Sequence, residues 1–456
     1  MKQFYIKDLA KIINANTTSD MPPDSSFSSV STDSRATKKG DCFFAIKGPN
    51  FDGHDYVQQA FQNSAACAVV SKDVNTKNTL IVKDTLKALG DFAAHYRKTQ
   101  DFKVIAITGS VGKTTTRHIV HHVLSKKYKT AQAPKNFNNT IGLPLTLLNA
   151  DPQHQIVVAE LATNHPGEIN YLSKIASPEI ALVTNVQPAH LEGFADLNAI
   201  ANEKISIADG LTTDGTLIIN ADCEILLDTA KQKNLNFMTF GKSDHCDIQA
   251  KNISCQPSQS LFTIDSEKIN LPLPGPGNVE NAVAAWAVCK LLRIKIEDFA
   301  LALNSLPPLN MRTEIIKLGK ITVINDCYNA NPASMKNTLK ILANLKTKKQ
   351  RLVFICGDMA ELGKNTEPLH EQLGSDIADA KIDLLITVGK LAKITQQSAK
   401  INAHYKLNTK SFDDTISACN NLHKFIKDYD IVLVKASRTM KLENAVEKLK
   451  ELFGKK

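Results

Sequence analysis

The sequence lacks any apolar run that approaches the ~18 residues of a membrane span. Its first residues, MKQFYIKDLAKII, place Lys7, Asp8 and Lys11 among the apolar positions. That pattern is typical of an amphipathic helix and differs from the uninterrupted apolar core of a signal peptide. We therefore expect a cytoplasmic protein with no membrane span.

Paired cysteines are also missing. The nine cysteines are scattered from Cys42 to Cys419 and include no C-x-x-C pair. This spacing argues against a zinc site and against a disulfide framework, and it predicts reduced, mostly buried thiols.

A basic stripe interleaved with aromatic residues is absent as well. The formal charge is +9, from 55 Lys and Arg against 46 Asp and Glu, but the lysines are spread along the chain among the acids. Nucleic acid is therefore not an expected partner, whereas the positive balance suits small polyanions such as nucleotides.

A phosphate-binding signature is present between residues 103 and 128. The apolar run KVIAIT (103–108) predicts a buried strand, and apolar residues at helical spacing follow the next two glycines. Strand, glycine loop and helix in this order direct backbone N–H groups and the positive end of the helix dipole at an anion. Lys113 adds a cation for terminal phosphates, and Thr114 adds a hydroxyl for Mg²⁺.

The loop is a variant of the common P-loop, because two residues separate its glycines where the common form has four. A plain strand-to-helix turn with a surface lysine is the simpler alternative, but the flanking strand and helix favour nucleotide binding. The residues predicted to contact the nucleotide are Gly109, Ser110, Val111, Gly112, Lys113, Thr114 and Thr115.

The length favours about three domains. Residues 1–83 contain a helix and short strands between polar loops, and residues 84–312 alternate strands and helices in the rhythm of a doubly wound parallel sheet. A linker-like stretch, LPPLNMRTE (306–314), leads into residues 313–456, where four apolar strands alternate with helices again. We predict an α/β protein of three domains: a small N-terminal α/β domain, a central P-loop parallel-sheet ATPase domain and a C-terminal Rossmann-like domain.

Ligands of such sheets bind beyond the carboxyl ends of the strands, where several polar residues fall. Glu160 closes an apolar strand, the position of the carboxylate that holds Mg²⁺ in P-loop proteins. For His190, four residues past another strand, a structural role and a ligand role both stay open. For Lys204, in a helical stretch, an exposed surface lysine is the simpler interpretation.

Polar loops also follow the strands of the third region. Asp326 and Ser437 lie in two of them, and each of these residues is also a plausible helix cap. In the first region, Arg35 beside Asp33 and Ser34 is able to hold an anionic group through its planar fork, although an ordinary turn explains the tripeptide equally well.

Seven stretches resemble motifs of the Mur ligases of peptidoglycan synthesis, in the order and spacing of that family. They are TGSVGKTTT (108–116), NFNNTIGLPLTLL (136–148), ELATNHPGEI (160–169), AHLEGF (189–194), DCYNANPASM (326–335), GDMAELG (357–363) and KASRTMKLE (435–443). The combination of NHPGEI, YNANP and GDMAELG is most similar to the branch of the family that adds D-alanyl-D-alanine to UDP-N-acetylmuramoyl-tripeptide.

The resemblance implies an ATP-dependent amide ligase that makes a peptidoglycan precursor through an acyl phosphate and releases ADP and phosphate. ATP and Mg²⁺ are the implied cofactors, the two small molecules named above are the implied substrates, and a monomer is expected. Its domains would bind the UDP-substrate (1–83), ATP (84–312) and the incoming amino component (313–456).

The resemblance also implies residue roles. Lys113 would bind the ATP phosphates, Thr114 and Glu160 would hold one Mg²⁺, and His190 would help to hold a second. Lys204 falls where the family has a lysine that CO₂ converts to an anionic carbamate. The remaining implied contacts are Ser34 and Arg35 to the UDP moiety; Asn136, Asn139 and Thr140 to the muramoyl-peptide; Asn281, Arg312 and Asp326 to the adenine nucleotide; and Tyr328, Asn329 and Ser334 near the reaction centre.

Two departures from the family pattern bear on the nucleotide. Val111 replaces a usual polar residue in the phosphate loop, and GPGN (275–278) stands where many members have Gly-Arg-His-Asn. The alternatives are another Mur-type or folylpolyglutamate-type amino acid ligase, a non-catalytic nucleotide-binding relative, and a P-loop kinase, for which no acceptor site is recognisable.

Overall fold

The computed structural model describes residues 1, 3–17, 22, 24–134, 136–188, 192–346 and 350–454. The chain forms two compact units, each described here by itself. The first comprises Met1–Thr108, Leu124–Val183 and Glu203–Ile218, and the second comprises Gly109–Val123, Thr184–Asn202 and Ile219–Lys456.

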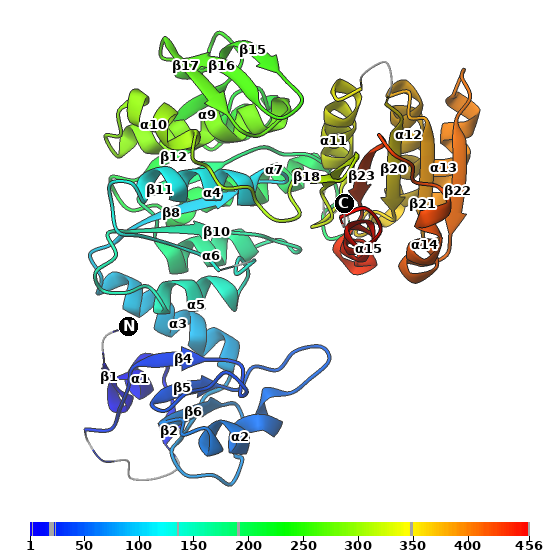
Figure 1. Cartoon of the computed structure of the whole chain (residues 1–456). Coiled ribbons are helices and arrows are strands. Elements are labelled where there is room, and N and C mark those ends of the chain that lie inside the picture. The colour runs from blue at the N-terminus through cyan, green and yellow to red at the C-terminus, as the bar shows by residue number, and fades with distance from the viewer. Residues whose placement is uncertain are drawn as a thin grey trace. The chain divides into compact units, whose positions relative to one another are not determined.

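The N-terminal part of the first unit is a small α/β structure (Figure 1). Its five-stranded sheet has the order β2 (Asn16–Thr17), β7 (Thr79–Ile81), β6 (Cys67–Val70), β5 (Asp41–Phe44) and β4 (Ser29–Ser31), parallel except for β2 against β7. The other elements are β1 (Phe4–Tyr5) paired with β3 (Ser26–Phe27), α1 (Ile6–Ile12), the 3₁₀ turn Gly53–Tyr56, α2 (Val57–Gln62) and α3 (Thr85–Lys98). Phe43, Ala45 and Val70 pack with Val57 and Ala60, so α2 covers one face of this sheet.

The first unit also contains the parallel strands of the central sheet. These are β8 (Lys103–Thr108), β9 (Thr130–Gln132), β10 (Ile156–Glu160) and β11 (Ile180–Val183), and β10 and β11 are buried along their whole length. Fully buried parallel strands read as continuous apolar runs, which is why the sequence indicated them. The connecting segments include α5 (Gly142–Leu148), α6 (Glu168–Ala176) and the 3₁₀ turn Ser206–Gly210, and α7 (Leu197–Ile205) begins in the second unit and ends in the first.

The central sheet continues through β12 (Thr216–Asn220), which leads into the second unit, to give the order β14-β13-β12-β11-β8-β10-β9. The second unit adds β13 (Phe237–Gly241), β14 (Ile248–Gln249), α4 (Lys113–Leu124), α8 (Glu224–Gln232), α9 (Pro276–Leu291) and α10 (Ile296–Leu303). It also holds a separate antiparallel sheet of β15 (Lys251–Cys255), β16 (Ser260–Ile264) and β17 (Glu267–Leu271). The sequence predicted strand–helix alternation throughout residues 84–312, and this antiparallel sheet corrects that prediction.

Residues 314–454 form the second α/β sheet of the chain. Its order is β18 (Glu314–Leu318), β19 (Ile321–Asn325), β23 (Ile431–Lys435), β20 (Leu352–Gly357), β21 (Leu384–Val388) and β22 (Asn408–Phe412). All strand pairs are parallel except β18 against β19. The helices are α11 (Pro332–Asn344), α12 (Thr366–Asp379), α13 (Ala392–Asn402), α14 (Thr415–Asn421) and α15 (Glu443–Phe453), with 3₁₀ turns at Gly363–Asn365, Leu422–Lys424 and Arg438–Met440.

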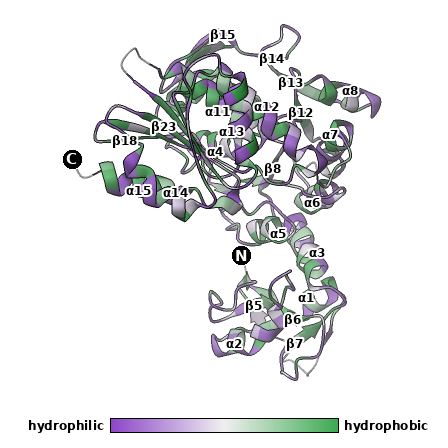
Figure 2. Cartoon of the chain, turned by 90° about the vertical axis from the view of Figure 1, so that its right-hand side faces the viewer, coloured by the Kyte–Doolittle hydropathy of each residue, from purple (hydrophilic) through white to green (hydrophobic). Residues whose placement is uncertain are grey.

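Helices cover both faces of this second sheet. Alternate strand residues such as Val353 and Val432 pack with Leu449 and its neighbours on α14 and α15. Their partners on the opposite face, such as Phe354, pack with Met335 and other residues on α11, α12 and α13. Figure 2 shows hydrophobic and hydrophilic residues side by side on α15, as a one-sided helix requires.

The architecture confirms the predicted α/β class with a P-loop parallel sheet and a C-terminal Rossmann-like sheet. Across the described ranges of the chain, no helix combines the length and the apolar character that crossing a membrane requires.

Candidate nucleotide-binding site

The phosphate loop joins β8 to α4 through two glycines with positive φ. Gly109 has φ +141°, and a Cβ added there would collide with Thr184 Oγ1. Gly112 has φ +89°, and a Cβ there would collide with Asn281 Oδ1 at the start of α9. Both positions require glycine because of backbone conformation and because of close neighbours.

Two residues after β11 hold the loop in shape. Asn185 accepts the backbone N–H of Val111 through Oδ1 at 3.0 Å, and its own carbonyl accepts the N–H of Ser110 at 3.0 Å. Thr184 donates its hydroxyl to the Val111 carbonyl at 2.6 Å. The Lys113 ammonium bends back onto the Gly109 carbonyl at 2.6 Å, so the cation of the loop lies beside its backbone turn.

A pocket opens beside this loop within the second unit. It is lined by the phosphate loop, by the start of α9, by the segment before β18, and by residues of the C-terminal sheet and α11. The lining residues are Val111, Gly112, Thr115, Asn185, Pro276, Gly277, Asn278, Glu280, Asn281, Arg312, Thr313, Asp326, Ser334, Asn337, Thr338, Ile341 and Lys435. The structure therefore brings together predicted nucleotide contacts from three distant parts of the chain.

Arg312 connects the loop to the C-terminal sheet. Its Nη2 atom donates to Thr114 Oγ1 at 3.4 Å, and its guanidinium carbon lies 4.0 Å from the centroid of the Tyr328 ring. A planar guanidinium stacks on an aromatic face more favourably than an ammonium does, because its charge is delocalised and weakly hydrated. Arg312 is therefore held flat against Tyr328, with one edge toward the phosphate loop.

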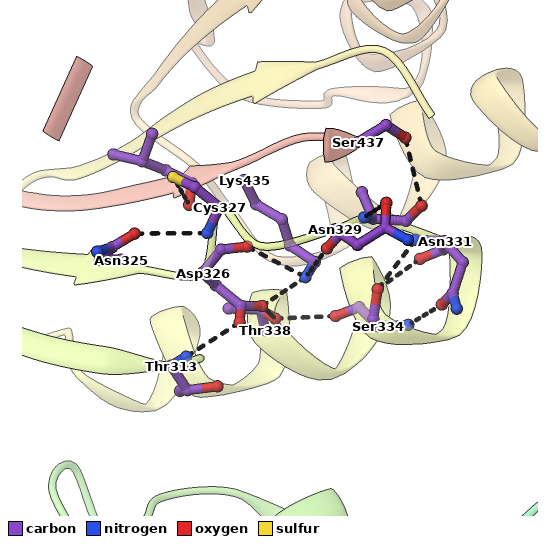
Figure 3. A network of polar contacts seen from close by, with 12 residues as sticks. Thr313, Asn325, Asp326, Cys327, Asn329, Asn331, Ser334, Thr338, Lys435 and Ser437 are labelled. Carbon is purple, nitrogen blue, oxygen red and sulfur yellow. Dashed lines mark hydrogen bonds and ion pairs between the residues drawn. The ribbon is translucent and has the colours of Figure 1, made fainter. Parts of the chain in front are cut away.

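A buried ion pair lies at the carboxyl edge of the second sheet (Figure 3). Lys435 ends β23, and its Nζ lies 2.5 Å from Asp326 Oδ2 and 3.0 Å from the Asn329 carbonyl. Asp326 also accepts the N–H of Thr313 at 3.0 Å and the hydroxyl of Thr338 at 2.7 Å. Asp326 thus joins the segment before β18 to β23 and α11, which rules out a role as a simple helix cap.

The loop between β19 and α11 is fixed by its own polar groups. Asn331 and Ser334 form a capping box at the start of α11, in which each side chain bonds the backbone of the other. The Asn329 amide oxygen accepts the N–H groups of Ala330 at 2.9 Å and Arg438 at 3.3 Å. Burial raises the pKa of the Cys327 thiol and so favours its protonated form.

Ser437, the other residue that was a possible helix cap, makes no side-chain cap bond to its 3₁₀ turn. Its hydroxyl accepts the N–H of Ala360 at 2.7 Å. The capping interpretation is wrong for Ser437 as it is for Asp326.

Two predicted metal-site residues lie in the first unit and are buried. Glu160 is 3% exposed and accepts the Asn138 amide at 2.9 Å. Lys204 is 2% exposed, so the expectation of an exposed surface lysine is wrong. Its neighbour Glu203 accepts the backbone N–H groups of Gly167 and Ile169, both at 2.7 Å, and ties α7 to the start of α6.

The predicted muramoyl-peptide residues cluster before α5. Asn136 and Asn139 are exposed, and Thr140 is half-buried. The Asn139 side chain accepts the N–H groups of Ile141 and Gly142 and so stabilises the turn into α5.

The predicted UDP contacts lie after β4. The buried Ser34 hydroxyl donates to Gln59 at 2.6 Å, and the Arg35 guanidinium makes two bonds to Asp33 at 2.8 and 2.9 Å. These bonds lower the pKa of the Asp33 carboxyl, chiefly through the side-chain hydrogen bond. Arg35 is exposed, so an incoming anion would replace Asp33 as the partner of its guanidinium.

His190 lies outside the described residues. Within the described ranges, no group of three or more His, Cys, Asp or Glu is close enough to hold a metal. The donors predicted for Mg²⁺ at Thr114 and Glu160 are oxygen atoms, which fit a hard cation that keeps waters and phosphate oxygens among its ligands.

Sequence reasoning missed several functional candidates. Thr184, Lys435, Thr338 and Asn337 were assigned no role, because each depends on which strands and helices become neighbours. Lys435 carried one signal: a lysine at the end of an apolar strand must find a partner when it is buried.

Three descriptions of known protein families match the chain. "Mur ligase family, catalytic domain" matches residues 26–97, "Mur ligase middle domain" matches 107–289, and "Mur ligase, glutamate ligase domain" matches 311–438. Among characterised proteins, UDP-N-acetylmuramoyl-tripeptide--D-alanyl-D-alanine ligase of Buchnera aphidicola subsp. Baizongia pistaciae is 37% identical over 442 residues, which is 94% of each chain.

Solved structures agree over the full length. A crystal structure of MurF from Acinetobacter baumannii superimposes with a TM-score of 0.91 at 31% identity, covering 99% of both chains. MurF of Thermotoga maritima, solved in complex with ADP, superimposes with a TM-score of 0.81 at 27% identity, covering 93% of this chain and 97% of that one.

Proposed function

The chain belongs to the Mur ligase family, and from this premise we propose that it joins D-alanyl-D-alanine to UDP-N-acetylmuramoyl-tripeptide at the expense of ATP. The observation that carries the proposal is the match to a ligase of that name over 94% of both chains. A relative that had exchanged its amino-component domain would match over only part of its length.

A carboxylate does not condense with an amine in water near neutral pH, so it must first gain a better leaving group. The terminal carboxylate of the tripeptide attacks the γ-phosphorus of ATP, which forms an acyl phosphate and expels ADP. The amino group of D-alanyl-D-alanine then attacks the acyl carbon, and the tetrahedral intermediate expels inorganic phosphate and leaves the new amide. One ATP is therefore consumed for each C–N bond formed.

The phosphate loop supports the first step. The start of α4, together with the loop N–H groups that Asn185 does not hold, presents partial positive charge to the phosphates. Lys113 would exchange the Gly109 carbonyl for a phosphate oxygen. Arg312, held against Tyr328 and reaching Thr114, adds a second cation at the same pocket.

Mg²⁺ belongs to this proposal. Thr114 and Glu160 would hold one ion, and His190 with a carbamylated Lys204 would help to hold another. Bound there, the ions would offset phosphate charge during phosphoryl transfer. The burial of Lys204 supports a role inside the protein and not at its surface.

The remaining site assignments complete the proposal. Asn281 and Asp326 would contact the adenine nucleotide from the pocket they line. Ser34 and Arg35 would contact the UDP moiety, the cluster of Asn136, Asn139 and Thr140 the muramoyl-peptide, and Tyr328, Asn329 and Ser334 the reaction centre. We also propose domain limits of 1–83, 84–312 and 313–456, and a cytoplasmic monomer.

The test is ATP-dependent phosphate release with UDP-N-acetylmuramoyl-tripeptide and D-alanyl-D-alanine, each left out in turn. Release that requires both substrates is the expected result. Release that responds to a different amino acid in place of D-alanyl-D-alanine would move the enzyme to another step of the family. Absence of release in every combination would favour the non-catalytic relative.

A further inference from the structure

Helix α11 turns one face toward the nucleotide pocket. Ser334, Asn337, Thr338 and Ile341 all line the pocket, and their spacing of three, one and three residues places them on the same side of the helix. Ser334 and Thr338 can be followed on this face in Figure 3.

Two of the three polar residues on this face are used by the protein itself. Ser334 belongs to the capping box, and Thr338 donates to Asp326 and to the Ser334 carbonyl. The half-buried Asn337 differs, because its amide makes no hydrogen bond to any described residue. An amide in that position is available to a ligand.

The other polar side chains of the neighbouring wall are occupied. Asn278 bonds the Pro274 carbonyl at 2.8 Å, Glu280 pairs with Lys242 at 2.7 Å, and Asn281 contacts Thr116 and Asn278, both at 3.3 Å. Residues 275–278 read GPGN and provide no long polar side chain of their own. Among the described residues of α9 and α11 that line the pocket, Asn337 is therefore the polar side chain that stays available.

Helix α9 fixes how far Asn337 lies from the phosphate loop. Asn281 sits directly against Gly112, and the Asn337 amide nitrogen lies 3.0 Å from where a Cβ on Gly277 would be. Asn281 follows Gly277 by four helical steps, which is about 6 Å along the axis at 1.5 Å per residue. A nucleotide with its phosphates at the loop places its base at this distant end of the pocket.

Apolar groups flank the amide there. Pro276 lines the pocket, and Ile341 lies against Gly275, one helical turn from Asn337. In such a site the apolar residues contact the two faces of a ring, and the amide lies at the edge of the ring. This composition is expected of a purine site. A side chain at position 277 would contact the Asn337 amide closely, so glycine there leaves the amide in its position.

We infer that Asn337 reads the base of the nucleotide, with its amide oxygen accepting a hydrogen bond from the exocyclic N6 amine of adenine. An amide carries one acceptor and one donor group, and an adenine edge presents the N6 amine beside a ring nitrogen, which is the complementary pattern. The inference rests on the proposed function, because it takes ATP as the nucleotide.

The test compares ATP with purine riboside triphosphate, which lacks the N6 amine. Asn337→Leu keeps the size of the side chain and removes both polar groups. It should lower kcat/KM for ATP by about five- to a hundredfold and leave the value for purine riboside triphosphate nearly unchanged, so that the preference for ATP collapses. Asn344→Leu, at an exposed asparagine of α11 outside the pocket, is the matched control and should keep the preference.

An Asn337→Leu protein that loses activity equally with both nucleotides, or keeps the ATP preference of the wild type, would overturn the inference. If Asn337→Leu does not fold by circular dichroism, Asn337→Ala provides the same test, because it also removes the amide. Its ATP preference should fall, and an unchanged preference would contradict the inference.

Direct titration of the full chain with ADP and purine riboside diphosphate separates this inference from the proposed function. Wild type that binds ADP more tightly, with the difference lost in Asn337→Leu, supports base reading even if no phosphate release is found. Equal binding of the two by the wild type would overturn base reading even if the ligase is active.

Discussion

The Lys435 ammonium and the Asp326 carboxylate form a 2.5 Å ion pair with side chains only 3% and 9% exposed. They come from adjacent parallel strands, β23 and β19, whose ends meet at one edge of the sheet. Two backbone carbonyls, the Thr313 N–H and the Thr338 hydroxyl complete the network. The pair therefore fixes the segment that carries Arg312 as well as the loop that carries Asn329.

Breaking this pair should destabilise the protein strongly. Lys435→Met leaves a buried carboxylate without its cation, which costs about 3–5 kcal/mol of the free energy of unfolding. Urea denaturation of the full chain measures the loss. The double variant Lys435→Met/Asp326→Asn should lose less than the sum of the single variants, because the second change removes the uncompensated charge. Lys320→Met, in an exposed pair with Asp428, is the control and should change little. Additive losses would show that the two residues act independently.

Lys113→Ala should abolish ATP-dependent phosphate release. The substitution removes the mobile cation of the phosphate loop but leaves the glycines and the bonds to Asn185. Titration with UDP-N-acetylmuramoyl-tripeptide should give an unchanged affinity, because no predicted contact to that substrate is altered. Lys103→Ala, at the exposed start of β8, is the control. Substantial phosphate release by the Lys113→Ala protein would contradict the assignment of Lys113 to the site.

Lys204→Ala should be inactive and should recover partly with short carboxylic acids, which supply the anion that a carbamate would provide. The measurement is activity as a function of added acetate or propionate, for the Lys204→Ala protein and for the wild type. Because Lys204 is buried, thermal unfolding must show that the variant is folded. Lys174→Ala, at an exposed lysine of α6, should be active without added acid. Full activity of Lys204→Ala would contradict the carbamate.

The N-terminal part should lose stability in acid through Asp52. The backbone N–H and then the imidazole of His54 hold the pKa of the Asp52 carboxyl well below its usual value. A carboxyl whose pKa is lowered by folding stabilises the folded state above its unfolded pKa, near 3.9, and loses that contribution as the pH falls through the folded pKa. Asp52→Asn should therefore be less stable than the wild type at pH 6, and the difference should shrink toward about pH 3.

Urea denaturation at several pH values checks this. Lys72→Met removes a weaker partner of the same carboxylate and should retain the pH dependence of the wild type. A difference between wild type and Asp52→Asn that stays constant down to pH 3 would show that ionisation of Asp52 does not contribute.

How much of this structure the sequence predicts depends on burial. The strands β8, β10 and β23 were recognisable because parallel strands covered on both faces are continuous apolar runs. The edge strand β22, NTKSF, is mostly polar and gave no such signal. The sheet of β15–β17 was missed because its alternating residues, half of them exposed, give a weaker signal than a continuous apolar run.

The site divides in the same way. The phosphate loop is local in sequence, so its glycines and Lys113 were predicted from spacing alone. The partners that shape it, Thr184 and Asn185, lie more than seventy residues away, and only the order of the strands brings them to the loop. The burial of Lys204 was likewise unpredictable, because polar and apolar residues are mixed around it and only tertiary packing encloses it.

The antiparallel strand β18 follows directly on the linker and lies at one end of the second sheet. Because it covers the side of β19, the second sheet carries its own protective border, and β22 with its polar residues forms the other border. A gene segment starting near residue 314 would therefore encode a sheet without an exposed apolar margin prone to aggregation.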